Sequence, residues 1–170
     1  MKNTENKSFQ VEVVLLEPEI PQNTGNIART CAALRCPLHI VEPLGFSLRD
    51  RHLRRAGIDY WDLVDLRRYK NFNEFKESNK NGILYFFTSR GQKSYHYAEY
   101  NGLVYLVFGK ESTGLSIEMV EENKENCYRI PMYPGIRSLN LATTVGIVIY
   151  EAFRQNNFFG LSGFDESINL

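Results

Sequence analysis

Short runs of β-branched, aromatic and aliphatic residues recur along the chain, and they are the strongest guide to its fold. Several are nearly continuous instead of alternating with polar residues, which is typical of strands that are covered on both faces in a parallel sheet. The runs are VEVVLLEP (11–18), LHIVEP (38–43), YWDLVDL (60–66), ILYFFTS (83–89), LVYLVFG (103–109) and CYRIPM (127–132).

Helical patterns lie between most of these runs, at about 23–35, 50–57, 71–79 and 116–124, with a long one near 139–156. The link after Ser89 is less clearly helical. Alternation of strand and helix predicts an α/β fold, a parallel sheet with helices on both sides. A length of 170 residues fits one domain. We therefore expect a single domain over 1–170 with a core at about 11–156, and loose ends over the first eight and the last ten or so residues.

The last helix is apolar over most of its circumference. A helix of this kind must be buried on two sides. The second side faces either a neighbouring element of the same chain or another subunit, and the pattern leaves both readings open. One stripe holds Leu141, Val145, Val148, Ile149 and Ala152, and Ile147, Tyr150 and Phe153 widen it.

The net charge and the cysteine and histidine content limit the kinds of function that the chain can have. The formal net charge is zero, so a nucleic-acid partner requires a local basic patch. Three separated cysteines without a C-x-x-C pair fit a reducing cytoplasm, and the three histidines have no metal-ligand spacing. No apolar run reaches the roughly 18 residues of a membrane span, and residues 1–10 do not resemble a signal peptide.

One segment qualifies as a basic patch. RDRHLRRAG carries four arginines, and LRRYK adds Arg67, Arg68 and Lys70. On a helix, Arg51, Arg54 and Arg55 share a face. The segment is either an ordinary solvated helix or an anion-binding face. The four arginines are Arg49, Arg51, Arg54 and Arg55.

Familiar nucleotide and hydrolase motifs do not occur. No G-x-G-x-x-G follows a strand, and GKEST at 109–113 lacks the leading glycine of a phosphate loop because position 104 is valine. No G-x-S-x-G is present either.

Polar residues instead gather after three of the predicted strands, where ligands bind in open α/β sheets. The first group is Asn23-Thr24-Gly25-Asn26 with Arg29; the second is FGKESTGLS; the third is Arg137, Ser138 and Asn140. Asn, Thr and Ser here also suit helix caps, and Glu111 also suits a capping or surface carboxylate. In the second group, Gly109 would let a ligand approach the backbone and Gly114 suggests a turn.

Four motifs together resemble the SPOUT superfamily of RNA ribose methyltransferases, over about 11–155. The nearest branch is the small single-domain family that methylates the 2′-hydroxyl of the tRNA wobble nucleotide, a cytidine or a modified uridine at position 34. The motifs are PEIPQNTGNIARTCAAL, LRRAGIDYWDL, LVFGKESTGLS and RIPMYPGIRSLNLATTVGIVIYEAFRQ.

This resemblance implies a parallel sheet whose C-terminal segment threads a trefoil knot, and a cytoplasmic homodimer formed through the last helix. It implies S-adenosylmethionine as the methyl donor, without a metal, and the tRNA anticodon loop as the substrate. The matching cofactor positions are Thr88, Gly109, Ile130, Met132 and Ser138.

The resemblance also implies that Arg29 contacts the RNA phosphate and the ribose hydroxyl, with Asn23, Glu111 and Asn140 shaping the catalytic site. An arginine pKa above ~12 makes a neutral guanidinium rare, so we expect Arg29 to orient and stabilise instead of acting as the base. Arg49, Arg51, Arg54 and Arg55 would bind tRNA. The same reaction on rRNA, or a non-catalytic RNA-binding protein, remains an alternative.

Overall fold

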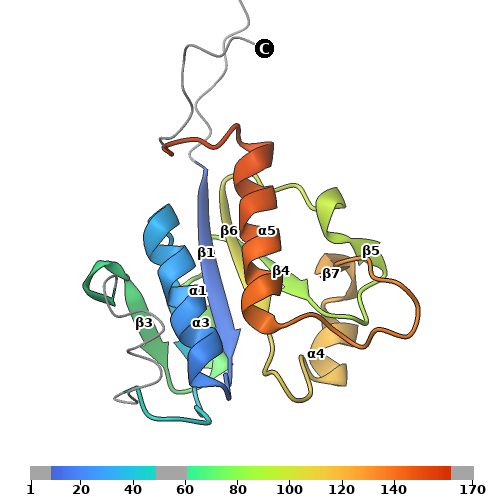
Figure 1. The fold of residues 1–170 in the computed structure, drawn as a ribbon, viewed down its shortest axis with the longest axis horizontal. Helices are drawn as coiled ribbons and strands as arrows, with labels where there is room; N and C mark the ends of the chain where they lie inside the picture. The colour runs from blue at the N-terminus through green and yellow to red at the C-terminus, as the bar shows by residue number, and fades with distance from the viewer. Residues whose placement is uncertain (1–8, 49–60, 162–170) are drawn as a thin grey trace, which may run out of the picture.

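A computed structural model describes residues 9–48 and 61–161, which form a seven-stranded sheet flanked by helices (Figure 1). The strand order is β3-β2-β1-β6-β4-β7-β5, and every pair of neighbours is parallel. The predicted α/β class is confirmed. The strands are β1 (Gln10–Leu16), β2 (Leu38–Val41), β3 (Leu66–Tyr69), β4 (Ile83–Phe87), β5 (Lys93–Ser94), β6 (Leu103–Phe108) and β7 (Cys127–Arg129).

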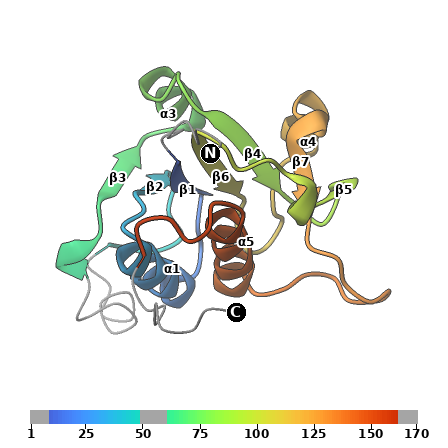
Figure 2. The same ribbon diagram turned by 90° about the horizontal axis from the view of Figure 1, so that it is seen from above.

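The helices cover both faces of this sheet. Figure 2 shows α1 and α5 on one face and α3 and α4 on the other. Among the parts of the chain that the structure describes, no helix is long and apolar enough to cross a membrane. The helices are α1 (Pro21–Leu34), α3 (Phe72–Ser78), α4 (Ile117–Glu122) and α5 (Leu141–Gln155), with 3-10 turns η1 (Trp61–Leu63), η2 (Tyr95–Tyr97) and η3 (Lys124–Asn126).

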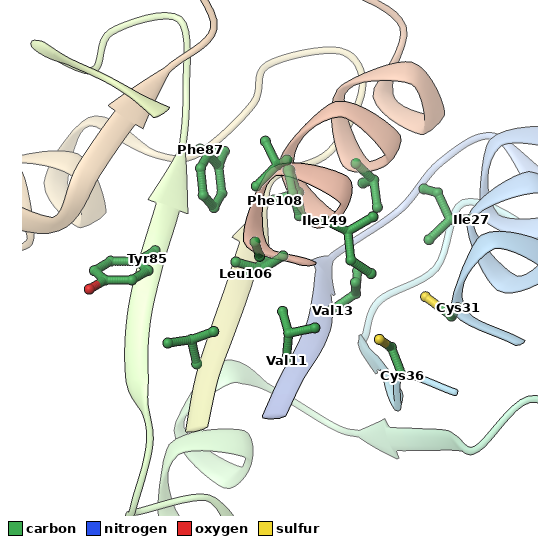
Figure 3. Close-up of a cluster of buried hydrophobic side chains, with 14 of the residues drawn as sticks. Val11, Val13, Ile27, Cys31, Cys36, Tyr85, Phe87, Leu106, Phe108 and Ile149 are labelled. Atoms are coloured by element: carbon green, nitrogen blue, oxygen red, sulfur yellow. The ribbon is translucent and has the colours of Figure 1, made fainter. Parts of the chain in front are cut away.

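Two hydrophobic clusters, one on each face, explain why the strand sequences are apolar without alternation. Successive side chains of a strand point to opposite faces. In β1, Val13 packs in the cluster under α1 and α5, whereas Val14 packs in the cluster under α3 and α4. Figure 3 shows Ile149 of α5 and Ile27 of α1 in the first cluster, close to Val13. Both faces of the central strands are therefore core.

The polar side chains of Glu12, His39 and Tyr69 form a hydrogen-bonded chain on the α3 side of the sheet, in which Glu12 and His39 are buried and Tyr69 is partly buried. His39 Nε2 lies 2.5 Å from a Glu12 carboxylate oxygen, and His39 Nδ1 lies 3.0 Å from the Tyr69 hydroxyl. Asn79 donates to the same hydroxyl at 3.2 Å and accepts from Tyr105 at 3.3 Å. These bonds tie strands β1, β2, β3 and β6 to the end of α3.

Most predicted elements are present with shifted ends, but the strand at 60–66 is wrong. Residues 61–63 form η1, and the strand is Leu66–Tyr69. This edge strand reads LRRY, so it lacks the apolar run on which the prediction depended. Arg67 pairs with Asp65 and Glu12, and Arg68 pairs with Glu42, which explains how charged residues sit in the sheet.

Three further segments refine the expectations. The link after Ser89 contains the short strand β5 and η2, and α4 ends at Glu122 before η3. The strand predicted over 127–132 ends at Arg129, so Ile130 and Met132 leave the sheet. The helix predicted at 50–57 lies outside the described residues, and the trefoil knot stays a prediction.

Candidate active site

A cavity of about 430 Å³ opens at the carboxyl ends of β4, β6 and β7. The first turn of α1 and the start of α5 complete its wall. The location agrees with the rule that ligands bind beyond the carboxyl ends of strands in open α/β sheets. All five positions that were expected to hold a cofactor line it: Thr88, Gly109, Ile130, Met132 and Ser138.

Hydrogen bonds connect the three polar groups that follow β1, β6 and β7. Asn23 donates through Nδ2 to a Glu111 carboxylate oxygen at 3.0 Å. The other end of the Asn23 amide, Oδ1, accepts from Asn140 Nδ2 at 2.9 Å. Both ends of the amide are engaged, so Asn23 holds Glu111 and Asn140 at fixed positions. The polar residues that follow three of the strands therefore meet at one edge of the sheet.

Asn140 also begins α5. Its Oδ1 accepts from the backbone N–H groups of Ala142 at 2.8 Å and Thr143 at 3.2 Å, which makes it the N-cap. An N-cap satisfies helix donors that have no partner within the helix. One side chain thus performs both roles that were considered for it, since its oxygen caps the helix and its nitrogen binds Asn23.

Glu111 provides the N-terminus of α1 with the carboxylate that the local sequence does not supply. The N-cap residue of α1 is Ile20, which has no side-chain cap, and Pro21 occupies the first turn. Glu111 accepts from the backbone N–H groups of Glu19 at 2.8 Å and Ile20 at 3.3 Å. A negative group is favourable at this end of a helix dipole. The reading of Asn23 or Thr24 as the cap of α1 is wrong, because the helix already begins at Pro21.

The loop at 109–114 is attached to the end of β1 by further contacts. Lys110 pairs with Glu17 at 2.8 Å. Ser112 donates to Glu19 through its hydroxyl and its backbone N–H, both at 2.9 Å. These hydrogen bonds from Ser112, the hydroxyl first, lower the pKa of the Glu19 carboxyl. The loop is therefore held in place by charged and polar contacts on its β1 side.

Glycine is required at two positions of this loop for different structural reasons. Gly114 has φ of +70°, so the predicted turn is confirmed. A Cβ at Gly109 would lie 2.2 Å from the Gly114 carbonyl carbon and 2.4 Å from the Leu115 nitrogen. The space beside Gly109 is filled by the protein's own backbone. Closure of the turn, and not only ligand approach, thus requires glycine here.

The arginines that the sequence singled out differ in whether they line the cavity. Arg29 is exposed on α1 and is not among the residues that line the cavity. Arg137 lines the cavity and donates to the Ser112 carbonyl at 2.9 Å. Arg67 and Arg68 are engaged by carboxylates. Arg49, Arg51, Arg54 and Arg55 lie outside the described residues.

Sequence reasoning missed Arg90, which also lines the cavity. Its Nη1 donates to the Leu115 carbonyl at 2.9 Å. The signal was available, because Arg90 follows the end of β4 by three residues, as the other site groups follow their strands. Over residues 9–48 and 61–161, no cluster of three or more His, Cys, Asp or Glu side chains could hold a metal ion.

Comparisons with known proteins show the family of the chain. The sequence pattern of the SpoU rRNA Methylase family matches residues 10–150. A protein of Geobacillus stearothermophilus with the provisional name tRNA (cytidine(34)-2'-O)-methyltransferase is 48% identical over 155 residues, which is 89% of this chain and 99% of that protein.

Two solved structures of RNA methyltransferases also resemble the chain. One, described as structural insights into the 2-OH methylation of C/U34 on tRNA, has a TM-score of 0.83 at 45% identity and covers 88% of this chain and 98% of that one. An AdoMet-bound rRNA methyltransferase from Sinorhizobium meliloti has a TM-score of 0.75 at 25% identity, over 90% of this chain and 57% of that one.

Proposed function

The chain belongs to the SpoU methylase family, and on this premise we propose that it transfers a methyl group from S-adenosylmethionine to the ribose 2′-hydroxyl of nucleotide 34 of a tRNA. The observation that carries the proposal is the cavity at the strand ends, with the linked Asn23, Glu111 and Asn140 beside it. The names of the similar proteins suggest the substrate, cytidine or uridine 34.

The cavity fits the cofactor in size and lining. Pockets for ligands of this size span about 300–1,000 Å³ and combine apolar walls with a few polar groups. Ile130, Met132 and Leu141 offer apolar surface, and Thr88 and Ser138 offer hydroxyls. When bound, S-adenosylmethionine supplies an activated methyl group on a sulfonium, so the protein needs neither a metal nor a covalent nucleophile.

The residues of the chain then have to align the ribose oxygen with the methyl carbon. They also have to stabilise the charge that develops during the transfer. The bond from sulfur to the methyl carbon breaks as the bond from the 2′-oxygen forms, and the hydroxyl proton leaves to water or a phosphate. Both Glu111 oxygens already accept hydrogen bonds from Glu19, Ile20 and Asn23. We therefore assign Asn23, Glu111 and Asn140 positioning roles.

Arg29 would act from the outer surface of α1. Its exposure suits contact with an RNA phosphate and the ribose hydroxyl, as the family motif implies. Arg29 follows Asn23 by six residues, nearly two turns of α1, and it does not line the cavity, so the bound RNA would have to reach both places. A permanent positive charge suits orientation and stabilisation of the transition state.

A homodimer through α5 is part of the proposal. Val145, Val148 and Ile149 of α5 are buried within the chain, but Tyr150 is 49% exposed. Phe159, just beyond the helix, is 60% exposed. This apolar surface supports the reading in which another subunit covers the second side of α5. A tRNA substrate would place the protein in the cytoplasm, and the arginines at 49–55 would add contacts with the anticodon loop.

The experiment is transfer of labelled methyl from S-adenosylmethionine to tRNA that lacks this modification, followed by nuclease digestion to locate the label. Label on the 2′-oxygen of nucleotide 34 is the expected result. The family name and the rRNA methyltransferase among the similar structures favour ribosomal RNA as the second candidate. Label in rRNA but not in tRNA would replace the tRNA proposal. No label in either RNA, together with no binding of the cofactor, would favour a non-catalytic RNA-binding protein.

A further inference from the structure

Two arginines on the cavity wall are anchored to the same turn. Arg90, three residues after β4, donates to the Leu115 carbonyl, and Arg137, in the segment between β7 and α5, donates to the Ser112 carbonyl, both at 2.9 Å. Both side chains are exposed, and both line the cavity. A turn that is itself tied to β1 thus holds two guanidinium groups from distant segments at one rim.

Neither guanidinium is neutralised by an ion pair within 9–48 or 61–161. Arg67, Arg68 and Arg154, by contrast, each pair with a carboxylate. The acidic groups near the turn are already engaged, since Glu19 accepts from Ser112, and Glu111 accepts from the start of α1 and from Asn23. The rim therefore carries two positive charges that no acidic side chain of the described chain balances by direct contact.

The hydrogen-bonding capacity of the two groups exceeds what the turn uses. A guanidinium has five N–H donors in a planar fork, which matches the oxygens of a phosphate or carboxylate. One carbonyl bond occupies one donor on each side chain and fixes its direction. Within residues 9–48 and 61–161 the other donors of the two groups make no hydrogen bond, so they can bind an anion.

We propose that Arg90 and Arg137 form an anion site that binds a backbone phosphate of the RNA substrate beside the nucleotide to be methylated. The inference rests on the function proposed above and names a second contact region for the substrate. In a chain without net charge, such a local pair supplies the electrostatic attraction that RNA binding requires.

The segment that carries Arg137 favours RNA as the source of the anion. Tyr133 is 89% exposed and Ile136 is 58% exposed in this segment. Figure 2 shows the segment between β7 and α5 extending away from the sheet. Exposed aromatic rings beside arginines are the combination with which proteins bind unpaired nucleotides, because the ring stacks on a base while the guanidinium binds the phosphate. The carboxylate of S-adenosylmethionine is the other anion that could reach the pair.

The test compares Arg90→Gln and Arg137→Gln with the wild-type protein in two measurements. Binding of unmodified tRNA is measured by filter binding at several salt concentrations, and binding of S-adenosylmethionine is measured by calorimetry without RNA. Lys80→Gln is the matched control, since it removes one exposed positive charge between α3 and β4, at the other end of the sheet. Arg90→Lys and Arg137→Lys keep the charge but lose the fork.

For each glutamine variant we expect the Kd for tRNA to rise about tenfold and the slope of log K against log salt to fall by about 0.7, the loss of one contact to a single strand. Lysine should restore part of the affinity, and Lys80→Gln should change neither quantity. The affinity for S-adenosylmethionine should stay within about twofold.

Two results would overturn the inference. Unchanged tRNA affinity and salt slope in variants that melt like the wild type would remove both arginines from the RNA site. A parallel loss of S-adenosylmethionine affinity without a change in salt slope would assign the pair to the cofactor carboxylate. Because these are binding measurements, they remain decisive even if the wild-type protein methylates no tRNA, so failure of the inference and failure of the proposed function are separable.

Discussion

Replacement of Asn140 separates its two roles in one pair of variants. In the wild-type protein, Oδ1 caps α5 and Nδ2 donates to Asn23. Asn140→Asp keeps the acceptor that caps the helix but loses the donor to Asn23. Asn140→Ala loses both. The aspartate variant therefore tests the link to Asn23 alone, and the difference between the variants measures the cap.

The expected magnitudes follow from the contacts. Loss of an N-cap costs about 1 kcal/mol, and loss of one hydrogen bond between side chains costs about 1 kcal/mol. We expect the free energy of unfolding to fall by about 1 kcal/mol in Asn140→Asp and by about 2 kcal/mol in Asn140→Ala. For a domain of this size each kcal/mol lowers Tm by about 2–4 °C.

Urea denaturation and methyl-transfer kinetics are the assays. Because Asn140 fixes Asn23 and the cavity wall, we expect kcat/KM to fall on the order of tenfold in both variants, although their stabilities differ. Equal stability of the two variants would refute the capping argument. Wild-type kinetics in Asn140→Asp would refute the claim that the bond to Asn23 positions the site.

Four other perturbations have defined outcomes. Gly109→Ala should abolish S-adenosylmethionine binding in calorimetry or prevent folding, because the new Cβ would meet the Gly114 backbone at 2.2 Å; binding with wild-type affinity would contradict this. Tyr69→Phe should lower the free energy of unfolding by about 1–3 kcal/mol, since it leaves the buried His39 Nδ1 without its partner, and denaturation in urea would measure it. Burial raises the pKa of the Cys36 thiol to about 12 and that of Cys31 well above its usual value, so a disulfide reagent should label neither in the native protein and all three cysteines after unfolding; rapid native labelling would count against the packing. Hydrogen bonds from Arg154, with smaller help from Gln155, lower the pKa of Glu151. The folded state therefore releases that proton more readily than the unfolded state, so this contribution to stability is present above the ordinary carboxyl pKa of about 4.3 and is lost as the pH falls through the lower folded value. Denaturation at several pH values should show a shallower acid loss in Glu151→Gln, and an unchanged profile would rule the group out.

The local pattern of the sequence determined the architecture and the edge of the sheet at which the candidate site lies. Continuous apolar runs such as LVYLVFG require cover on both faces, and the structure provides it. Polar groups after successive strands of a parallel sheet must meet at one edge, which is why Asn23, Glu111 and Asn140 could be expected to converge. The resemblance to the family added five positions that are expected to bind the cofactor, and all five line the cavity.

Only the tertiary structure decided which groups touch, because the partners are distant in the chain. Glu111 and Asn23 are 88 positions apart, and Asn140 and Asn23 are 117 apart, so strand order and register set these contacts. The same holds for the edge strand LRRY, whose arginines pair with Glu12, which lies two strands away, and with Glu42, which follows β2. Arg90 follows a strand end as the other site groups do, but only the fold shows that the Leu115 carbonyl accepts a hydrogen bond from it at the rim. The periodicity of the sequence shows which face of an element is buried. The packing of the whole sheet determines which residues that face contacts.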